Sequence, residues 1–203
     1  MNSSHSRLAL PKVSKPVTYT KPTIASSKAA KITREVSSAS QLPRRKPLIK
    51  KEIPMVTWKD FSGVPKKDSY WLAYTTYFVR YSFRPVTLKG KPPTLHLTVT
   101  CTLNPKTSWV KWKDDLLLEH EQGHYLIGWI SALTFKQRVL EANLAINGNL
   151  STEIQKIYKE TMREFALWQR IYDEETEHYL DQEMQDKWNE KIKSTLDSLK
   201  CYL

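Results

Sequence analysis

The chain has 203 residues, 40% of them hydrophobic and 26% charged, which suits one packed domain of ordinary size plus a terminal segment. It contains no apolar run of about 18 residues, so no membrane-spanning helix is expected. Its two cysteines, Cys101 and Cys201, exclude a disulfide framework and a cysteine-based zinc finger.

The net charge of +11 is concentrated near the N-terminus. Residues 1–50 contain 11 Lys/Arg and one acid, whereas the remaining residues contain 21 Lys/Arg and 20 Asp/Glu. This Ser-, Lys- and Pro-rich stretch has too little apolar surface to offset the entropy of ordering it. We therefore predict a disordered basic tail over residues 1–53 and a folded domain over residues 54–203. A solvated linker is the favoured interpretation of the tail, with contact to anionic surfaces as the alternative; no specific nucleic acid partner is indicated.

Two segments in the first half of the domain have the composition of strands. Residues 69–83 (SYWLAYTTYFVRYSF) are aromatic and β-branched. Residues 93–103 (PTLHLTVTCTL) alternate clearly between apolar and polar side chains. The intervening KGKPP is typical of a turn, so a small antiparallel sheet with one buried face is expected.

The second half changes to a helical period. A helix is predicted from about Trp112 to Asn147, where Asn147-Gly148 suits a helix terminus. Ser151 or Thr152 can then cap a second helix, whose pattern continues toward Leu199. Its expected inward stripe consists of Ile154, Tyr158, Thr161, Phe165, Trp168, Tyr172, Glu175 and Tyr179. The predicted fold class is α+β, with a small antiparallel sheet followed by a long helical hairpin and a C-terminal helix.

The first predicted helix contains the sequence HEQGH at residues 120–124. Positions i and i+4 lie on one face of a helix, so His120 and His124 can bind one metal ion. Glu121 is rotated by about 100° from His120, which places it where a general base for a metal-activated water should stand. The pattern predicts a zincin-like metallopeptidase that uses Zn²⁺. Two helix histidines with only local hydrogen bonds are the alternative.

The predicted hairpin brings a second stretch of sequence to the motif. If the chain reverses near residues 148–149, positions whose numbers sum to about 297 lie level on the two helices. His120 then lies opposite the region of Glu177, and His124 opposite the region of Asp173. A third metal ligand is therefore expected from this part of the second helix.

The stretch IYDEETEHYL supplies the remaining candidates. His178 is the predicted third ligand, with Glu174 and Glu175 as alternatives. Tyr172 is a candidate catalytic donor to a developing oxyanion, and a core position is its alternative. Asp173 is expected to hold the free nitrogen of a ligand histidine.

The stretches VTWKDFSGVP, SWVKWKDDLLLEHEQGHYLIG and YDEETEHYLDQEMQDKW, together with the aromatic strand, resemble a bacterial family. This family, domain of unknown function 922, is described as predicted secreted zinc-dependent proteases. The resemblance covers roughly residues 54–190. It implies metal binding at His120, His124 and His178, with Glu121 as the catalytic residue.

The resemblance also implies a secreted or periplasmic protein, although no signal peptide is visible in this chain. The family commonly has a Phe directly after the HEQGH motif and a Gly after the second motif's histidine. This chain has Tyr125 and Tyr179 at those positions. The expected substrate is a peptide or protein lying along an exposed strand edge such as TLHLTVTC, residues 94–101.

Two other functions are compatible with the same residues. The sequences EQGH and ETEH are both Glu-x-x-His, which on facing helices is typical of a di-iron carboxylate protein. That site needs further glutamates from two more helices. Because the first half of the domain is predicted to form strands, at least one of these helices is missing. The second alternative is a non-catalytic, metal-stabilised domain that binds a cell-envelope component.

Overall fold

The structure of the protein is a computed structural model that describes residues 52–203, so the predicted tail lies outside the described residues except for its last two positions. The strands are β1 (Ala73–Tyr74), β2 (Tyr77–Val86), β3 (Thr94–Leu103) and β4 (Trp109–Val110). The helices are α1 (Asp115–Glu141), α2 (Leu150–Glu175) and α3 (Gln182–Leu199). The predicted α+β class, with a small antiparallel sheet followed by helices, is confirmed. None of the helices in the described part of the chain is long and apolar enough to cross a bilayer.

The main sheet is a long hairpin of β2 and β3, paired antiparallel from Tyr77↔Leu103 to Val86↔Thr94. Its predicted alternation is confirmed, because the odd-numbered side chains of β3 are turned inward and the even-numbered ones outward. The predicted strand over residues 69–83 is wrong in its extent. It is interrupted before β2, where the Thr76 N–H donates to the Ser108 hydroxyl (2.9 Å). The residues before this break form the short strand β1, which pairs with β4.

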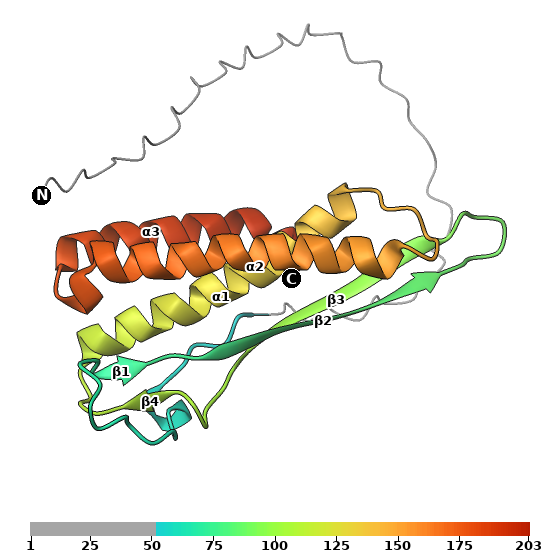
Figure 1. Ribbon diagram of the computed structural model, residues 1–203. Coiled ribbons are helices and arrows are strands. Elements are labelled where there is room, and N and C mark those ends of the chain that lie inside the picture. Colours follow the sequence, from blue (N-terminus) through green and yellow to red (C-terminus); the bar gives the residue numbers. More distant parts are fainter. Residues whose placement is uncertain (1–51) are drawn as a thin grey trace, which may run out of the picture. The chain divides into compact units, whose positions relative to one another are not determined.

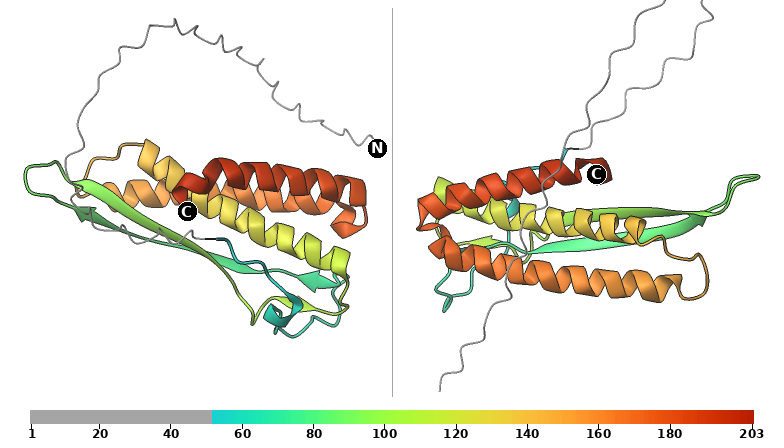
Figure 2. Two further views of the ribbon diagram at one scale, coloured as in Figure 1. Left: turned by 180° about the vertical axis from the view of Figure 1, so that it is seen from behind. Right: turned by 90° about the horizontal axis from the view of Figure 1, so that it is seen from above.

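Helix α1 is the centre of the domain. The sheet covers one side of it, and α2 and α3 cover the other, as the two views agree (Figures 1 and 2). Its side chains are therefore buried in several directions, from Leu117 at one end to Val139 at the other. A helix enclosed in this way can hold polar side chains only where neighbours satisfy them. The polar residues His120, Glu121 and Gln122 are all buried in its first turns.

The connection between α1 and α2 differs from the prediction. Helix α1 ends at Glu141, well before Asn147-Gly148, and Asn143 adopts a left-handed conformation with φ of 47°. Asparagine tolerates this conformation better than most residues, so it ends the helix. Helix α2 begins at Leu150 with Asn149 as its N-cap residue, so the predicted caps Ser151 and Thr152 are instead in its first turn.

The predicted inward stripe of α2 is confirmed at Ile154, Thr161, Phe165 and Tyr172, which are buried. It is wrong at its end, because Glu175 is exposed and Tyr179 lies beyond the helix. The helix then breaks over three consecutive residues with positive φ: Glu177 (47°), His178 (55°) and Tyr179 (84°). Asp181 starts α3 by accepting a hydrogen bond from the Met184 N–H (3.0 Å). The break turns the chain so that α3 also packs along α1 (Figure 1).

Candidate metal centre

The two motif histidines converge on one carboxylate of the opposite helix. The Nε2 atoms of His120 and His124 lie 3.2 and 2.9 Å from Oδ1 of Asp173. In residues 52–203, these three side chains form the group whose potential ligand atoms all lie within 4.8 Å of one another. The prediction that the hairpin places His124 level with Asp173 is therefore confirmed.

Gln169 fixes the orientation of His124. The Gln169 amide nitrogen donates to the Tyr77 hydroxyl (2.8 Å) and to the His124 backbone carbonyl (2.9 Å). Its amide oxygen must then accept the hydrogen bond that joins it to His124 Nδ1. The ring is therefore protonated at Nδ1, so Nε2, which faces Asp173, carries a lone pair unless the ring takes up a second proton.

The same logic applies to His120. Its Nδ1 lies 3.2 Å from Oε1 of Gln185, a residue of α3. The Gln185 amide nitrogen donates to the Tyr172 hydroxyl (2.7 Å), which in turn donates to the His120 backbone carbonyl (3.0 Å). The Thr176 hydroxyl donates to the Tyr172 carbonyl (2.7 Å) and so offers only a lone pair to His120 Nδ1 (3.3 Å). His120 is therefore also protonated at Nδ1.

This arrangement calls for a cation between the rings and the carboxylate. Two acceptors that face each other at 2.9–3.2 Å repel unless a positive charge separates them, either a second ring proton or a metal ion. The separations also approach the roughly 3.3 Å between neighbouring ligands of a tetrahedral zinc ion with bonds of about 2.0–2.1 Å. Two imidazoles and a carboxylate, with ring orientation fixed by amide oxygens, fit zinc or another imidazole-binding divalent metal.

The electrostatics of the pair favour its charged forms. Burial by itself lowers the pKa of His124, but the hydrogen bond to Asp173 and the charges of Glu121 and Asp173 outweigh burial and raise it. Burial by itself raises the pKa of Asp173, but the hydrogen bonds from His120 and His124 hold it far below its usual range. Asp173 is therefore an anion at neutral pH, as a metal ligand must be.

Glu121 is buried beside the histidines, with an exposed fraction of 4%. Its Oε2 has no hydrogen-bond partner among the described residues. Burying an unpaired carboxylate oxygen is costly, so such a group in a native fold points to an unseen partner such as water, substrate or an ion. Glu121 lines the same cavity as His120 and His124, which is where a general base should lie.

His178 lies at the edge of this group. Its Nδ1 is 3.3 Å from Oδ1 of Asp173, and its ring packs edge-on against Trp71 with 4.3 Å between the ring centres. Its contact with the group runs through Asp173, so its role as a ligand stays a prediction. The two alternative ligands point elsewhere: Glu174 lies 3.6 Å from Arg170, and Glu175 accepts from the Trp188 indole (2.8 Å). The position of Glu175 also weighs against a di-iron site built from both Glu-x-x-His motifs.

Tyr172 lies behind the histidines and not in the cavity wall. It is fully buried and its ring stacks on His120, with 4.6 Å between the ring centres. Its hydroxyl proton is used by the His120 carbonyl. A Cβ atom at Gly123 would lie 2.2 Å from this hydroxyl, so the glycine of HEQGH permits the close approach. These contacts make Tyr172 a positioning residue, and its predicted donation to an oxyanion finds no support in them.

Tyr77 is a phenol that the sequence did not single out. It lines the cavity and accepts a hydrogen bond from Gln169, while in the described residues its own proton has no acceptor. Burial raises the pKa of Tyr77 to about 12, so it stays protonated. Its ring rests on Gly128, where a Cβ atom would lie 2.7 Å from ring carbons. Gln169 could have been found from the sequence, one turn before Asp173 on the same face, whereas Tyr77 and Gln185 gave no such signal.

The cavity that contains the site has a volume of about 680 Å³. Besides His120, His124 and Asp173 it is lined by residues 70–77, which include β1, and by residues 177–180 after α2. The expected strand edge over residues 94–101 is not part of its wall, so the strand beside the site is β1 and not β3.

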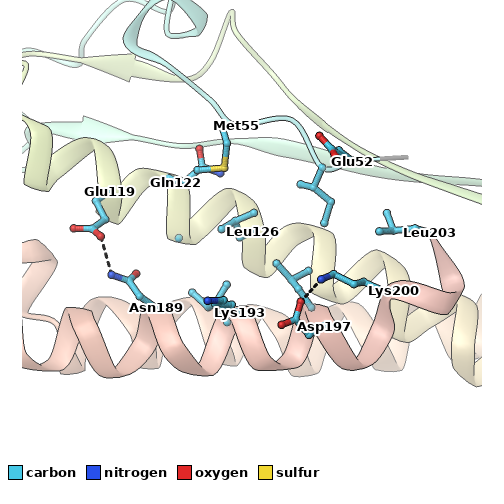
Figure 3. A pocket seen from close by; sticks show the side chains of 14 residues that line it. Glu52, Met55, Glu119, Gln122, Leu126, Asn189, Lys193, Asp197, Lys200 and Leu203 are labelled. Carbon is cyan, nitrogen blue, oxygen red and sulfur yellow. Dashed lines mark hydrogen bonds and ion pairs between the residues drawn. The ribbon is translucent and has the colours of Figure 1, made fainter. Parts of the chain in front are cut away.

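A second cavity, of about 800 Å³, lies between α1, α3 and the chain near Glu52 (Figure 3). Several of its polar groups pair with one another: Asn189 donates to Glu119 (2.9 Å), and Lys200 pairs with Asp197. Within residues 52–203 it holds no group of three potential metal ligands. The candidate site is therefore in the cavity of about 680 Å³ that contains His120, His124 and Asp173.

The fold and site define a class: an α+β protein in which a His-x-x-x-His helix faces a carboxylate across a helical hairpin to form a candidate metal centre. A family model described as a bacterial protein of unknown function (DUF922) matches residues 61–179, more than half of the chain. The chain belongs to this family. The matched region includes His120, His124, Asp173 and His178 and ends before α3. No curated protein and no solved structure matches the chain.

Proposed function

We propose that the protein is a zinc-dependent metallopeptidase that hydrolyses a peptide or protein substrate. We further propose that it is secreted or periplasmic, as the family resemblance implies. The observation that carries the proposal is the convergence of His120 and His124 on Asp173, beside the unpaired carboxylate of Glu121, in one cavity. His120, His124 and Asp173 would hold the metal, with His178 as a further ligand.

A bound zinc ion supplies a Lewis acid that polarises a carbonyl and lowers the pKa of water. The chain's own groups supply the proton transfers. Oε2 of Glu121 is free to accept a proton from water and to return it to the leaving amine. The free O–H of Tyr77 is available to donate to the oxygen that becomes negative during attack.

A peptide substrate is favoured by the strand in the cavity wall. Strand β1 pairs with β4 along one edge in a two-stranded sheet, so its other edge has no strand partner in the described part of the chain. An extended peptide can add to such an edge through backbone hydrogen bonds. The exposed side chains of Tyr70 and Tyr74 at the cavity offer contact to apolar substrate side chains.

Metal content is the first test of the proposal. Protein purified without added metal should contain close to one zinc per chain by plasma mass spectrometry, or take up one zinc after treatment with a chelator. Replacement of both motif histidines by glutamine should abolish this uptake. Uptake of iron in place of zinc, or no uptake of either metal, would contradict a zinc site.

Hydrolysis of a quenched fluorescent peptide library is the second test. Glu121→Gln should keep the zinc content and reduce hydrolysis by about 10²–10⁴-fold, because the amide cannot accept the proton. Glu119→Gln is the matched control, since Glu119 is exposed and two positions away, and should retain activity. A zinc-loaded wild-type protein without hydrolysis of any library member would favour a non-catalytic, metal-stabilised domain.

A further inference from the structure

The charges of the folded part are separated between its two layers. Residues 69–113, which contain all four strands, include seven Lys/Arg and no Asp/Glu. Residues 114–203, which contain the three helices, include 10 Lys/Arg and 17 Asp/Glu. The near-neutral charge of the domain thus conceals a basic sheet and an acidic helical layer, which lie on opposite sides (Figure 2).

The basic side chains gather on the outer face of the β2–β3 hairpin. Arg80 and Arg84 lie on the outward side of β2, and Lys89 and Lys91 follow in the hairpin turn. His96 on β3 is directly opposite Arg84. All five side chains are exposed, and the helices cover the other face of the sheet (Figure 1).

These cations have no counter-charge in the fold. Among the described residues no carboxylate forms an ion pair with Arg80, Arg84, Lys89 or Lys91, whereas Arg138, Lys187 and Lys200 of the helical layer each have one. Like charges on one face repel, and their repulsion is relieved when an anionic surface covers them. Within the described residues, ion pairs therefore do not compensate the positive charge of this face.

The hairpin also presents apolar side chains among the cations. Leu88 at its tip is 56% exposed between Thr87 and Lys89, and Phe78 on the same outer face is 44% exposed beneath the Arg80 guanidinium. Exposed apolar groups flanked by basic ones suit a bilayer interface, where the apolar group enters the acyl boundary and the cations contact anionic headgroups. A soluble polyanion would give Leu88 no such environment.

We propose that the outer face and tip of the β2–β3 hairpin bind the surface of an anionic phospholipid bilayer. Strand β2 starts at Tyr77 in the wall of the metal cavity and reaches the tip after ten residues, roughly 30 Å away. Binding through the tip leaves the cavity accessible. The proposal is independent of any catalytic activity.

Sedimentation of the full chain with lipid vesicles tests the proposal. Vesicles of phosphatidylcholine with about 30% phosphatidylglycerol should bind the protein, and vesicles of phosphatidylcholine alone should not. The variant Arg80→Gln/Arg84→Gln/Lys89→Gln/Lys91→Gln should lose at least about tenfold in vesicle affinity, because each basic residue near an anionic surface strengthens binding several-fold. Leu88→Ser should weaken binding to vesicles but not to soluble polyphosphate.

A variant of equal net charge is the control. Lys156→Gln/Lys159→Gln/Arg163→Gln/Lys193→Gln removes four exposed cations from the helical layer, and its vesicle affinity should stay within about twofold of wild type. Equal losses in both variants would assign binding to net charge or to the basic N-terminal residues and overturn the proposal. So would binding of polyphosphate with no binding of vesicles, or no loss in the hairpin variant. Circular dichroism should show that all variants remain folded.

Discussion

Gln169 forms two hydrogen bonds with His124. Its amide oxygen accepts from the ring Nδ1, and its amide nitrogen donates to the His124 backbone carbonyl (2.9 Å). The second hydrogen bond fixes the direction of the first. A backbone carbonyl can only accept, so the amide nitrogen must face it and the amide oxygen must face Nδ1. One glutamine thereby sets the tautomer of a candidate metal ligand and its rotation toward Asp173. Gln185 does the same for His120 from another helix, through Tyr172.

Replacement of Gln169 should therefore weaken metal binding without removing a ligand. We expect Gln169→Leu to reduce zinc affinity by about 10–100-fold, as is usual when the partner of a ligand histidine is lost, with the stoichiometry unchanged. Competition with a chromogenic chelator measures the change. Gln155→Leu, at an exposed position of the same helix, is the control and should bind zinc normally. Equal affinities for the two variants would show that the ring needs no such support.

The metal-free protein should lose stability as the pH rises above neutrality. The pKa of His124 is raised in the folded state, so its contribution is complete below about pH 6.5 and is lost as the pH rises through the folded value. The pKa of Asp173 is lowered, so its contribution is present above about pH 3.9 and is lost as the pH falls through the folded value. The His124–Asp173 pair therefore stabilises the metal-free fold most between about pH 3.9 and about pH 6.5.

Urea unfolding in the presence of a chelator, from pH 5 to pH 9, measures this dependence. In wild type the free energy of unfolding should decrease from about pH 6.5 upward. Asp173→Asn should be less stable at pH 6 and should show a smaller decrease, because the main anionic partner of His124 is gone. Saturating zinc should reverse the trend in wild type, since metal binding requires the unprotonated ring nitrogen. Parallel pH profiles for both proteins without metal would refute the assigned coupling.

The sequence predicts this site because helix geometry is regular. The spacing of His120 and His124, together with one chain reversal, was enough to place Asp173 level with His124. That prediction succeeded although the reversal itself was misplaced: α1 ends at Glu141, and an eight-residue connection leads to α2. The additional connecting residues lie beyond the ends of both helices. The positions of α1 and α2 that face each other are therefore almost unchanged.

What the sequence could not predict depends on the breaks between regular elements. The three left-handed residues after α2 set the direction of α3 and the reach of His178, and none of them is a glycine that would have marked a turn. The position of Gln185 in the site follows from that direction. The contribution of Tyr77 depends on how the sheet is placed against α1, which no local pattern encodes. Such long-range placements are fixed by packing and not by periodicity.

Gly123 should be intolerant of substitution. A Cβ atom there would lie 2.2 Å from the Tyr172 hydroxyl, and Tyr172 is fully buried, so the ring cannot move aside without disturbing His120. We expect Gly123→Ala to destabilise the protein by about 1–3 kcal/mol and to weaken zinc binding. Gly148→Ala meets no atom within 4 Å and should be neutral or slightly stabilising. Thermal unfolding of the two variants compares them directly, and equal effects would contradict the close approach.

Tyr179 has a φ of 84°, in the left-handed region that favours glycine. A non-glycine residue in this conformation costs on the order of 1 kcal/mol or more. We expect Tyr179→Gly to be at least as stable as wild type, even though some packing is lost. Leu180→Gly, at a neighbouring exposed residue with ordinary φ of −77°, should instead lose about 0.5–1 kcal/mol. A larger loss at Tyr179 than at Leu180 in urea unfolding would argue against backbone strain.

The two phenols of the site, the half-buried Tyr77 and the buried Tyr172, should respond differently to loss of the hydroxyl group. Tyr77 lines the cavity with its proton free, so Tyr77→Phe should lower kcat of any hydrolysis by about 10–100-fold with zinc affinity little changed. The Tyr172 hydroxyl bonds the His120 carbonyl and Gln185, so Tyr172→Phe should instead cost about 1–2 kcal/mol of stability and weaken zinc binding. Parallel measurement of kcat, zinc affinity and unfolding free energy separates the two effects. The reverse pattern, with kcat depending on Tyr172 and stability on Tyr77, would return the catalytic role to the phenol that the sequence first suggested.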